Sequence, residues 1–258
     1  NEAEVALVRA RRLIPEHPSI PLEEAQLSLD TNNLEQANAL AIEATTHLKS
    51  NPTVPFIRGI IAARLGRLEE ARNFFSSTLE IDPDHVRARL NRCSAALLCE
   101  DLSQALDDAD HLVNARPEHD LARLRRSEIL MNHGDWSEAE TELRNLLKRN
   151  SEHSMALVHL GTCMIATGKS EQAERPLNKA IGIDPNLSEA WYQRGLLYLD
   201  FGRVDEAMSD FEGAARTDPH HIDARLRIAA ILHEGEDFDK AVAAWRQVLD
   251  IEPQHRLA

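Results

Sequence analysis

The apolar positions of residues 188–221 follow two helical stripes, with polar residues between them. Trp191, Gly195 and Tyr198 stand at i, i+4 and i+7, so they share one face of a predicted helix. After a short break, a second stripe repeats the alternation of small and large residues, in Ala207, Phe211 and Ala214. Asp218-Pro219 ends the unit, because proline suits the first turn of a following helix and not a helix interior. The pattern predicts two helices joined by a tight turn.

This two-helix pattern recurs every 34 residues along the chain. Alanine takes the same place in eight successive units, at Ala3, Ala37, Ala71, Ala105, Ala139, Ala173, Ala207 and Ala241. The place of Gly195 is small in every unit, at Ala25, Gly59, Cys93, Ser127, Gly161, Gly195 and Ala229. A small residue lets two helix backbones approach closely, while a large neighbour fills the groove. We therefore expect the six alanines from Ala71 to Ala241 to be buried at helix–helix contacts.

These residues resemble the tetratricopeptide repeat, a 34-residue unit whose signature runs Trp, Leu-Gly, Tyr, Ala, an aromatic residue and Pro. Every signature position of residues 188–221 matches except the leucine, which is Arg194 here. The resemblance implies an all-α fold, a right-handed superhelical solenoid of antiparallel helix pairs. It also implies that each pair packs only on its neighbours.

We predict a single array over residues 1–258, with fifteen helices and no strand. Residues 1–17 hold the second helix of a truncated repeat. The full repeats are expected at 18–51, 52–85, 86–119, 120–153, 154–187, 188–221 and 222–255. Pro176 lies in the middle of the helix expected over residues 170–183, where a proline costs about 3 kcal/mol. It should kink that helix or leave the carbonyl of Gln172 to water.

Several residues are expected to mark helix starts. Ser19 and Thr53 are candidate N-caps, because their hydroxyls can accept a backbone N–H. Asp135 and Glu138 have the spacing of a capping box. Three further places pair an acidic cap with a helix-starting proline, namely Asp82-Pro83, Asp184-Pro185 and Asp218-Pro219.

The net charge and the lengths of the apolar runs count against some classes of function. A formal net charge of −14 should repel nucleic acid and anionic lipid headgroups. No run approaches the roughly 18 apolar residues of a membrane span, and no signal-peptide pattern opens the chain. Since the first residue is Asn and falls inside a repeat, we expect a segment excised from a longer protein. The odd set of Cys93, Cys99 and Cys163 favours a reducing compartment such as the cytoplasm, and the compartment is otherwise open.

Histidines and carboxylates are the residues that could bind a metal ion or carry catalysis, and the sequence predicts no such site from either. Six of the twelve histidines share one phase in the turns between units, at His17, His85, His119, His153, His221 and His255. Neighbouring units are displaced by roughly 10 Å, whereas the ligands of one zinc ion lie about 2 Å from it. We therefore expect these histidines to pack and hydrogen-bond near helix starts, with no metal site and no cofactor. The carboxylates are scattered without a nucleophile or a phosphate loop, so we expect no enzyme activity.

Arginine is concentrated at residues 87–92 and 123–126 of this acidic chain, with a smaller group at Arg225 and Arg227. Two pairs lie one repeat apart and should stack in register, Arg89 with Arg123 and Arg92 with Arg126. Like charges in register repel, so something must offset them. The sequence leaves two alternatives, which are carboxylates of the chain itself (Glu128, Asp84 and Glu118) and an acidic ligand.

The family resemblance implies that a partner peptide lies along the concave face, against the first helix of each repeat. By position in the repeat, the candidate residues are Arg87, Asn91, Arg125, Glu128, Met131, Asn132, His159, Thr162, Tyr192, Gln193, Leu196 and Arg227. The carboxylate clamp of the chaperone-binding branch is not expected, because only Asn91 and Arg125 fall on clamp positions. A central basic zone and an apolar zone at Tyr192, Leu196 and Leu199 suit a peptide with acidic and apolar side chains.

We therefore predict a protein–protein interaction scaffold that binds a peptide or partner segment in the concave groove. Two alternatives remain open. One is a regulatory or substrate-presenting arm of a larger enzyme, such as a glycosyltransferase or hydroxylase, and the other is a segment of a secretion or polysaccharide-export assembly. The sequence also predicts end-to-end self-association, because both terminal helices carry apolar residues without a capping helix, among them Val5, Val8, Trp245 and Leu249.

Overall fold

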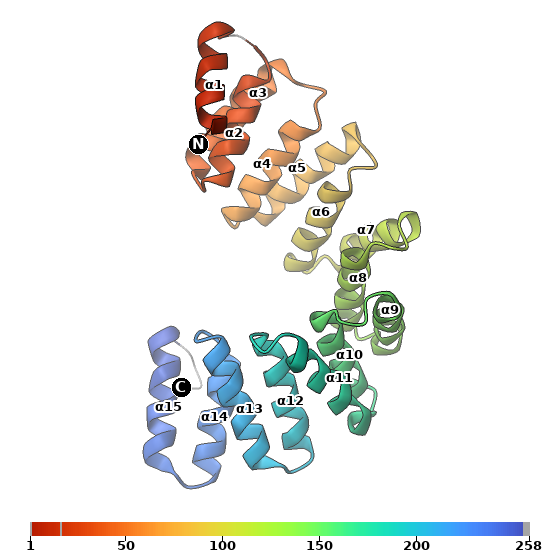
Figure 1. Cartoon of the computed structure of the whole chain (residues 1–258), viewed down its shortest axis with the longest axis vertical. Helices are drawn as coiled ribbons and strands as arrows, with labels where there is room; N and C mark the ends of the chain where they lie inside the picture. Colours follow the sequence, from red (N-terminus) through yellow and green to blue (C-terminus); the bar gives the residue numbers. More distant parts are fainter. Residues whose placement is uncertain (1, 16, 255–258) are drawn as a thin grey trace. The chain divides into compact units, whose positions relative to one another are not determined.

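The computed structural model describes residues 2–15 and 17–254, apart from the side chains of Ala3 and Glu4, and these residues form fifteen α-helices and no strand (Figure 1). The helices are α1 Glu2–Leu13, α2 Ile20–Asp30, α3 Leu34–His47, α4 Thr53–Arg64, α5 Leu68–Ile81, α6 Val86–Leu98, α7 Leu102–Ala115, α8 Asp120–His133, α9 Trp136–Arg149, α10 Ser154–Ala166, α11 Ser170–Ile183, α12 Ser188–Asp200, α13 Val204–Thr217, α14 Ile222–Glu234 and α15 Phe238–Ile251. The all-α class and the number of helices are as predicted.

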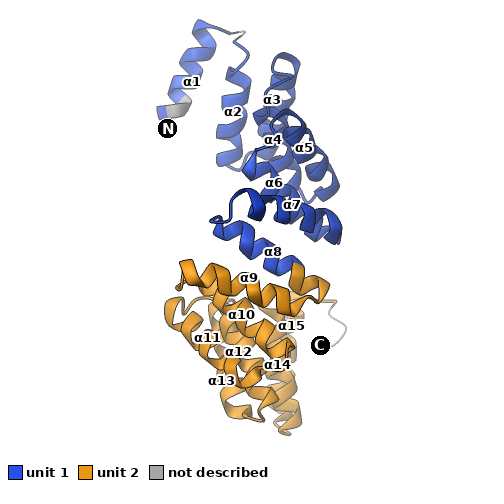
Figure 2. Cartoon of the chain, turned by 90° about the vertical axis from the view of Figure 1, so that its right-hand side faces the viewer, with its two compact units in different colours: residues 1–129 blue, residues 130–258 orange. Residues whose placement is uncertain are grey.

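The chain divides into two compact units, Asn1–Ile129 and Leu130–Ala258, and the division falls within α8 (Figure 2). In unit 1, α2 packs on α3 and α4, and α4 packs on α5 and α6. In unit 2, α10 contacts α9, α11 and α12, and the series continues through α15. Each unit is therefore a stack of helix pairs in which first helices also touch one another. The single array over residues 1–258 stays a prediction.

The alanines that recur every 34 residues lie where paired helices pack most closely. Five of the six are fully buried, namely Ala71, Ala105, Ala139, Ala173 and Ala207, and Ala241 is 2% exposed. The prediction from the 34-residue period is confirmed. Ala3 lies outside the residues whose side chains are described.

Two glycines show why the neighbouring small position must stay small. A Cβ atom added to Gly59 would lie 2.5 Å from Cε1 of Phe75, and one added to Gly195 would lie 2.7 Å from Cε1 of Phe211. Both phenylalanine rings are fully buried. The large residue of the second helix therefore fills the space that the glycine of the first helix leaves open.

In each repeat, one residue of the turn between the two helices has a backbone in the left-handed region. The residues there have φ between 59° and 92°, and they are Asn32, Gly66, Glu100, Gly134, Gly168, Gly202 and Glu236. The next N–H then reaches back into the first helix, as from Arg67 to the Ala62 carbonyl at 2.9 Å. Glycine adopts this conformation without steric cost, so its recurrence in the sequence marks the turn.

Histidine, and not the Asp-Pro pair, begins many of the first helices. Nδ1 of His85, His119, His153 and His221 accepts the backbone N–H three residues later, at 3.0 to 3.3 Å. The expectation that these histidines bond near helix starts is confirmed, and His255 lies outside the described residues. A ring nitrogen that accepts a backbone N–H must be unprotonated.

The expectation that Asp82-Pro83, Asp184-Pro185 and Asp218-Pro219 cap and start helices is wrong. Asp82, Asp184 and Asp218 are the C-caps of α5, α11 and α13, and their side chains accept the N–H two residues later. The prolines lie in the turn, ahead of the helix start. The preceding helix runs on to the aspartate, so that residue closes a turn instead of opening a helix.

Of the other predicted helix starts, Ser19 and Asp135 take the expected N-cap positions of α2 and α9 without a capping bond from the side chain, and the N-cap position expected for Thr53 is wrong. Thr53 is already the first residue of α4. The Asp135 carboxylate is instead 2.7 Å from Nδ1 of His133. Around Pro176, α11 is helical on both sides and the proline ring is buried, so the helix continues through it.

Candidate partner-binding surfaces

The twelve predicted groove residues all lie on first helices of repeats, and none is buried. Unit 1 contributes Arg87 and Asn91 from α6 and Arg125 and Glu128 from α8; unit 2 contributes Met131 and Asn132 from α8, His159 and Thr162 from α10, Tyr192, Gln193 and Leu196 from α12, and Arg227 from α14. In unit 2, α10 and α12 are in direct contact, so their exposed side chains form one continuous surface. The structure therefore brings together the predicted residues of α10 and α12.

Tyr192 is the best-supported side chain of this surface. Its ring centroid lies 5.7 Å from that of Phe211 and 4.9 Å from that of His221. Leu196 and Leu199 pack against the same core cluster and keep part of their surface exposed. The aromatic ring is thus held rigidly from below while one side stays open to solvent. We call Tyr192, Leu196 and Leu199 the apolar patch.

Unit 1 holds a counterpart of this arrangement at the same repeat position. Phe56 packs against Phe75 and His85, with centroid distances of 6.0 and 4.8 Å. The guanidinium of Arg87 lies over the Phe56 ring at 5.1 Å. Phe56 is buried, however, whereas Tyr192 is not. Of the two, only Tyr192 exposes part of its aromatic side chain to solvent.

Several polar groove residues bond within their own helices. Gln193 donates to Oε1 of Glu189 at 2.7 Å, Thr162 donates to the Val158 carbonyl at 3.2 Å, and Asn91 donates to the Arg87 carbonyl at 2.7 Å. These bonds are local and partly exposed. A partner could replace them at small net cost, because one hydrogen bond would be exchanged for another.

The arginine clusters are largely neutralised by the chain itself. Arg92 holds both carboxylate oxygens of Asp108 at 2.8 and 2.7 Å, and Arg89 reaches the same carboxylate at 3.3 Å. Arg126 donates to Asp110 at 2.6 Å. Of the carboxylates named from the sequence, Glu128 pairs with Arg125 at 2.6 Å. The intramolecular alternative is therefore the one seen, and the arginines no longer require an acidic ligand.

Asp108 and Asp110 were not predicted from the sequence as partners of these arginines, although the sequence contains a signal for Asp108. Asp108 follows Arg92 by 16 residues, and the same interval separates Arg194 from Asp210, which form the same two-bond pair. These arginines stand where the repeat signature has leucine. The hydrogen bonds that Arg194 donates to Asp210 raise the pKa of Arg194 and outweigh the effect of its burial. In these two repeats, arginine at the leucine place is accompanied by aspartate 16 residues later.

The two buried cysteines, Cys93 and Cys163, are poor nucleophiles. Burial raises the pKa of Cys93 and of Cys163 to about 12, so both thiols stay protonated near neutral pH. Over residues 2–15 and 17–254, no three His, Cys, Asp or Glu side chains are grouped so that they could hold a metal ion. Within the same ranges, no helix is both long enough and apolar enough to cross a bilayer.

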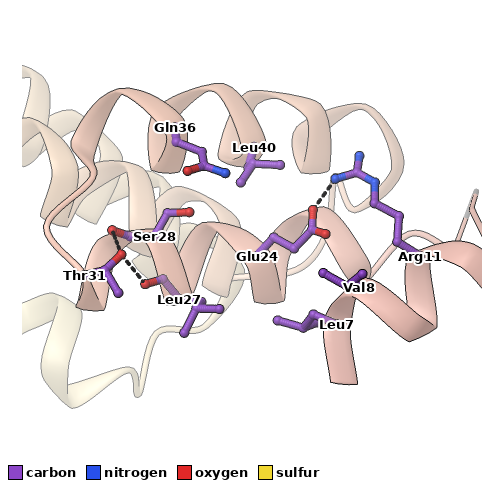
Figure 3. Close-up of a pocket in the computed structure, with 9 residues that line it drawn as sticks. All are labelled: Leu7, Val8, Arg11, Glu24, Leu27, Ser28, Thr31, Gln36 and Leu40. Carbon is purple, nitrogen blue, oxygen red and sulfur yellow. Dashed lines mark hydrogen bonds and ion pairs between the residues drawn. The ribbon is translucent and has the colours of Figure 1, made fainter. Parts of the chain in front are cut away.

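One cavity of about 270 Å³ lies between α1, α2 and α3 in unit 1 (Figure 3). Leu7, Val8, Leu27 and Leu40 line it, and Ser28 and Thr31 lie at one end. At the other end, the guanidinium of Arg11 pairs with Glu24 and also with Glu43 at 2.9 Å. Both charges are therefore already used, and the cavity has no charged group left for a ligand.

The terminal helices keep apolar side chains exposed. On α15, Phe238 is 55% and Val242 is 48% exposed, while Trp245 and Leu249 are half-buried by their own chain. On α1, Val5 and Val8 are exposed. End-to-end self-association through these residues stays a prediction.

Sequence comparison identifies the repeat in three parts of the chain. Two sequence profiles, each described as tetratricopeptide repeat, match residues 22–86 and 124–188 in one case and 198–258 in the other. No curated protein matches the sequence.

Solved structures with the same fold include three helical repeat proteins. A thermophilic tetratricopeptide repeat protein of Thermus thermophilus is 23% identical, with a TM-score of 0.61, over 70% of this chain and 99% of that one. A tetratricopeptide repeat protein of Parabacteroides merdae is 18% identical, with a TM-score of 0.70, over 89% and 91%. The APC/C hetero-tetramer Cut9–Hcn1 gives 14% identity and a TM-score of 0.74, over 97% of this chain and 50% of that one. At these identities, the likeness shows the fold alone.

Proposed function

The chain belongs to the tetratricopeptide repeat family, and from that premise we propose that it binds a peptide segment of a partner protein along the first helices α10, α12 and α14. Proteins of this family are protein–protein interaction scaffolds and are typically non-catalytic. The proposal concerns unit 2, where these helices follow one another in the stack.

The observation that carries the proposal is the apolar patch on α12. Tyr192 is fixed by Phe211 and His221 beneath it, so binding a partner would cost it little conformational entropy. Rigid, half-exposed aromatic residues are the side chains that most often dominate binding energy at interfaces. The patch is therefore the expected anchor point for an apolar residue of the peptide.

The surroundings of the patch indicate the rest of the peptide. Gln193 and Thr162 offer exchangeable hydrogen bonds, and Arg227 of α14 is an exposed cation. A peptide with one or two apolar residues and a polar backbone path fits this surface best. The acidic character expected from the sequence has lost its main support, since Arg92, Arg125 and Arg126 pair within the chain. No observation favours the enzyme-arm or export-assembly alternatives.

The test uses a phage-displayed library of random peptides, selected on the whole chain. The selected peptides are then titrated against the chain with Tyr192→Ala and Leu196→Ala combined, and against a Val204→Ala control. Val204 is an exposed apolar residue of the second helix α13, so the control removes apolar surface elsewhere in unit 2. We expect the double variant to weaken binding by at least about tenfold, which corresponds to ~1.4 kcal/mol.

Equal loss in the control and the double variant would show that the selected peptides do not use the patch. Selection of peptides that bind only the Val204 side would also contradict the proposal. Far-UV circular dichroism of each variant separates loss of binding from loss of fold.

A further inference from the structure

One arginine of the repeat series lacks the carboxylate that its counterparts have. Arginine takes the leucine position of the repeat signature four times, at Arg58, Arg92, Arg126 and Arg194. Arg92 and Arg194 each donate to an aspartate on the second helix of their own repeat, Asp108 and Asp210, and Arg126 donates to Asp110 on α7, the second helix of the preceding repeat. Where the signature leucine is present, as Leu160, the residue at the aspartate's place is the apolar Pro176. The two positions are therefore matched in polarity in these repeats.

Arg58 is the exception, because no aspartate stands at the matching position of the second helix in its repeat. The place that Asp108 and Asp210 take on the second helix is filled by Phe74, and the guanidinium carbon of Arg58 lies 4.1 Å from the centroid of that ring. Nε of Arg58 is buried and has no hydrogen-bond partner. No ion pair joins Arg58 to any residue that the structure describes. Stacking on an aromatic face leaves the in-plane N–H groups of a guanidinium unused.

Arg58 lies at a cavity of about 200 Å³ in unit 1, between the second helices α3 and α5 and above the first helix α4. Leu48, Val54, Phe74 and Ile81 make most of its wall apolar. Lys49 adds a second cation, which is exposed, and no acidic residue lines the cavity. In a chain with a net charge of −14, this is a local concentration of positive charge beside an apolar hollow.

We propose that this cavity binds the side-chain carboxylate of an aspartate or glutamate of a partner protein, together with an adjacent apolar side chain. The carboxylate would accept from the N–H groups of Arg58, as Asp108 does from Arg92 within the chain. Lys49 would add a longer-range attraction, and the neighbouring apolar residue would lie against Leu48 and Phe74. The inference is independent of the proposed function, because the cavity lies in unit 1 and the apolar patch in unit 2.

The geometry favours a side-chain carboxylate because Arg92 and Arg194 each bind both oxygens of an aspartate at the place that Phe74 takes beside Arg58, and Arg126 also pairs with an aspartate. A half-buried guanidinium has lost part of its hydration, and a bidentate carboxylate compensates that loss better than any neutral group. The aromatic ring occupies the internal position, so the anion has to come from outside the chain.

The experiment follows the Nε–Hε signal of Arg58 by ¹⁵N NMR in the whole chain. The probe is the tripeptide Leu-Asp-Leu, acetylated and amidated so that aspartate is its only charge. It is titrated to about 20 mM, since a contact of this size gives roughly millimolar affinity. The matched probes are blocked Leu-Asn-Leu and Leu-Asn-Leu with a free carboxyl terminus. Arg58→Gln identifies the signal by its loss.

We expect the aspartate probe to shift the Arg58 signal with saturation, and the blocked asparagine probe to shift it at least fivefold less at equal concentration. Backbone signals around the cavity should respond to the aspartate probe in the whole chain and in Arg12→Gln. Arg12 is an exposed arginine of α1, so that variant removes the same charge away from the cavity. The backbone response should be lost in Arg58→Gln.

Phe74→Asp provides a second, independent variant. It installs the aspartate that Arg92 and Arg194 already have, so Arg58 should pair internally and the probe should bind at least fivefold more weakly. Far-UV circular dichroism checks that each variant is folded, and Arg58→Gln alone decides the outcome if Phe74→Asp is not.

Three results would overturn the proposal. Equal responses to the aspartate and asparagine probes would show that charge is not recognised. A response only to the free carboxyl terminus would assign the cavity to a terminal carboxylate instead. Absence of any response at the highest probe concentration would show that Arg58 is satisfied by solvent.

Discussion

Arg194 on α12 holds both carboxylate oxygens of Asp210 on α13, with Nε–Oδ2 and Nη2–Oδ1 distances of 2.7 Å each. Nη1 of the same guanidinium donates to Oδ1 of Asn178 on α11 at 2.7 Å. The Asp210 side chain is 4% exposed. One arginine thus connects three helices of two adjacent repeats, at the place where the repeat signature has a leucine.

Removing only the arginine should therefore be costly. Arg194→Leu leaves the Asp210 carboxylate buried without its partner, and we expect a loss of about 3 kcal/mol in the free energy of unfolding. Arg194→Leu combined with Asp210→Ala removes both charges and should recover more than half of that loss. Urea unfolding of the two variants and the parent measures this. A double variant no more stable than the single one would show that the pair is not energetically coupled.

Glu140 should give unit 2 a pH-dependent stability. Burial by itself would raise the pKa of Glu140, but hydrogen bonds from Lys169 and Arg144 outweigh it and hold the pKa below the ordinary value. A carboxylate with a lowered pKa stabilises the fold above its unfolded-state pKa, about 4.3, and this contribution disappears as the pH falls through the lower folded pKa.

Glu140→Gln should consequently cost about 1 kcal/mol at pH 7, a modest figure because Lys169 and Arg144 are 43% and 48% exposed. The difference from the parent should shrink as the pH falls below about 4.3 and through the lower folded-state pKa, where the parent's carboxylate becomes protonated as well. Thermal unfolding across this range provides the measurement. A difference independent of pH would mean that Glu140 contributes by packing and not by charge.

Gly195 and Gly182 form a matched pair for testing close helix packing. Gly195→Ala places a methyl group 2.7 Å from the Phe211 ring and should destabilise by about 1–3 kcal/mol. Gly182→Ala meets no atom within 4 Å on α11 and should stabilise by about 0.5–1 kcal/mol through helix propensity. Chemical denaturation of both variants should give opposite signs. The same sign in both would show that α12 and α13 can move apart without cost.

The histidine caps can be tested at His153, whose Nδ1 accepts the Ala156 N–H at 3.3 Å at the start of α10. His153→Ala should destabilise by about 1 kcal/mol, and His153→Asn should restore most of this, because asparagine is a favoured N-cap. Urea midpoints at neutral pH distinguish the two. If alanine and asparagine are equally destabilising, the imidazole acts through packing rather than as a cap.

The sequence alone determined the fold class and the packing contacts between paired helices. A period of 34 residues, with alanine and glycine at fixed phases, fixes where two helix backbones can meet, and the burial of Ala71 to Ala241 followed directly. The turns that carry glycine, at Gly66, Gly134, Gly168 and Gly202, are also marked in the sequence, since only glycine adopts a positive φ without strain. Such features depend on residues near one another in the chain and on simple steric rules.

The starts of the helices were decided by tertiary structure. Asp82 and His85 both have side chains that can accept a backbone N–H, so the sequence offers two starts for α6. Which one caps the helix depends on how far the preceding helix α5 continues, and that length is set by its packing. The sequence reasoning chose the aspartate because proline follows it.

The charged surface also needed the structure. Arg92 and Asp108 are both visible in the sequence, but their pairing requires the second helix to turn its aspartate towards the first. The rotation of a helix about its axis follows from the apolar residues that it buries, not from its charges. The same rotation places Phe74, and not a carboxylate, beside Arg58. The period fixed which residues are equivalent, and only the packed helices decided which of these equivalents find a partner.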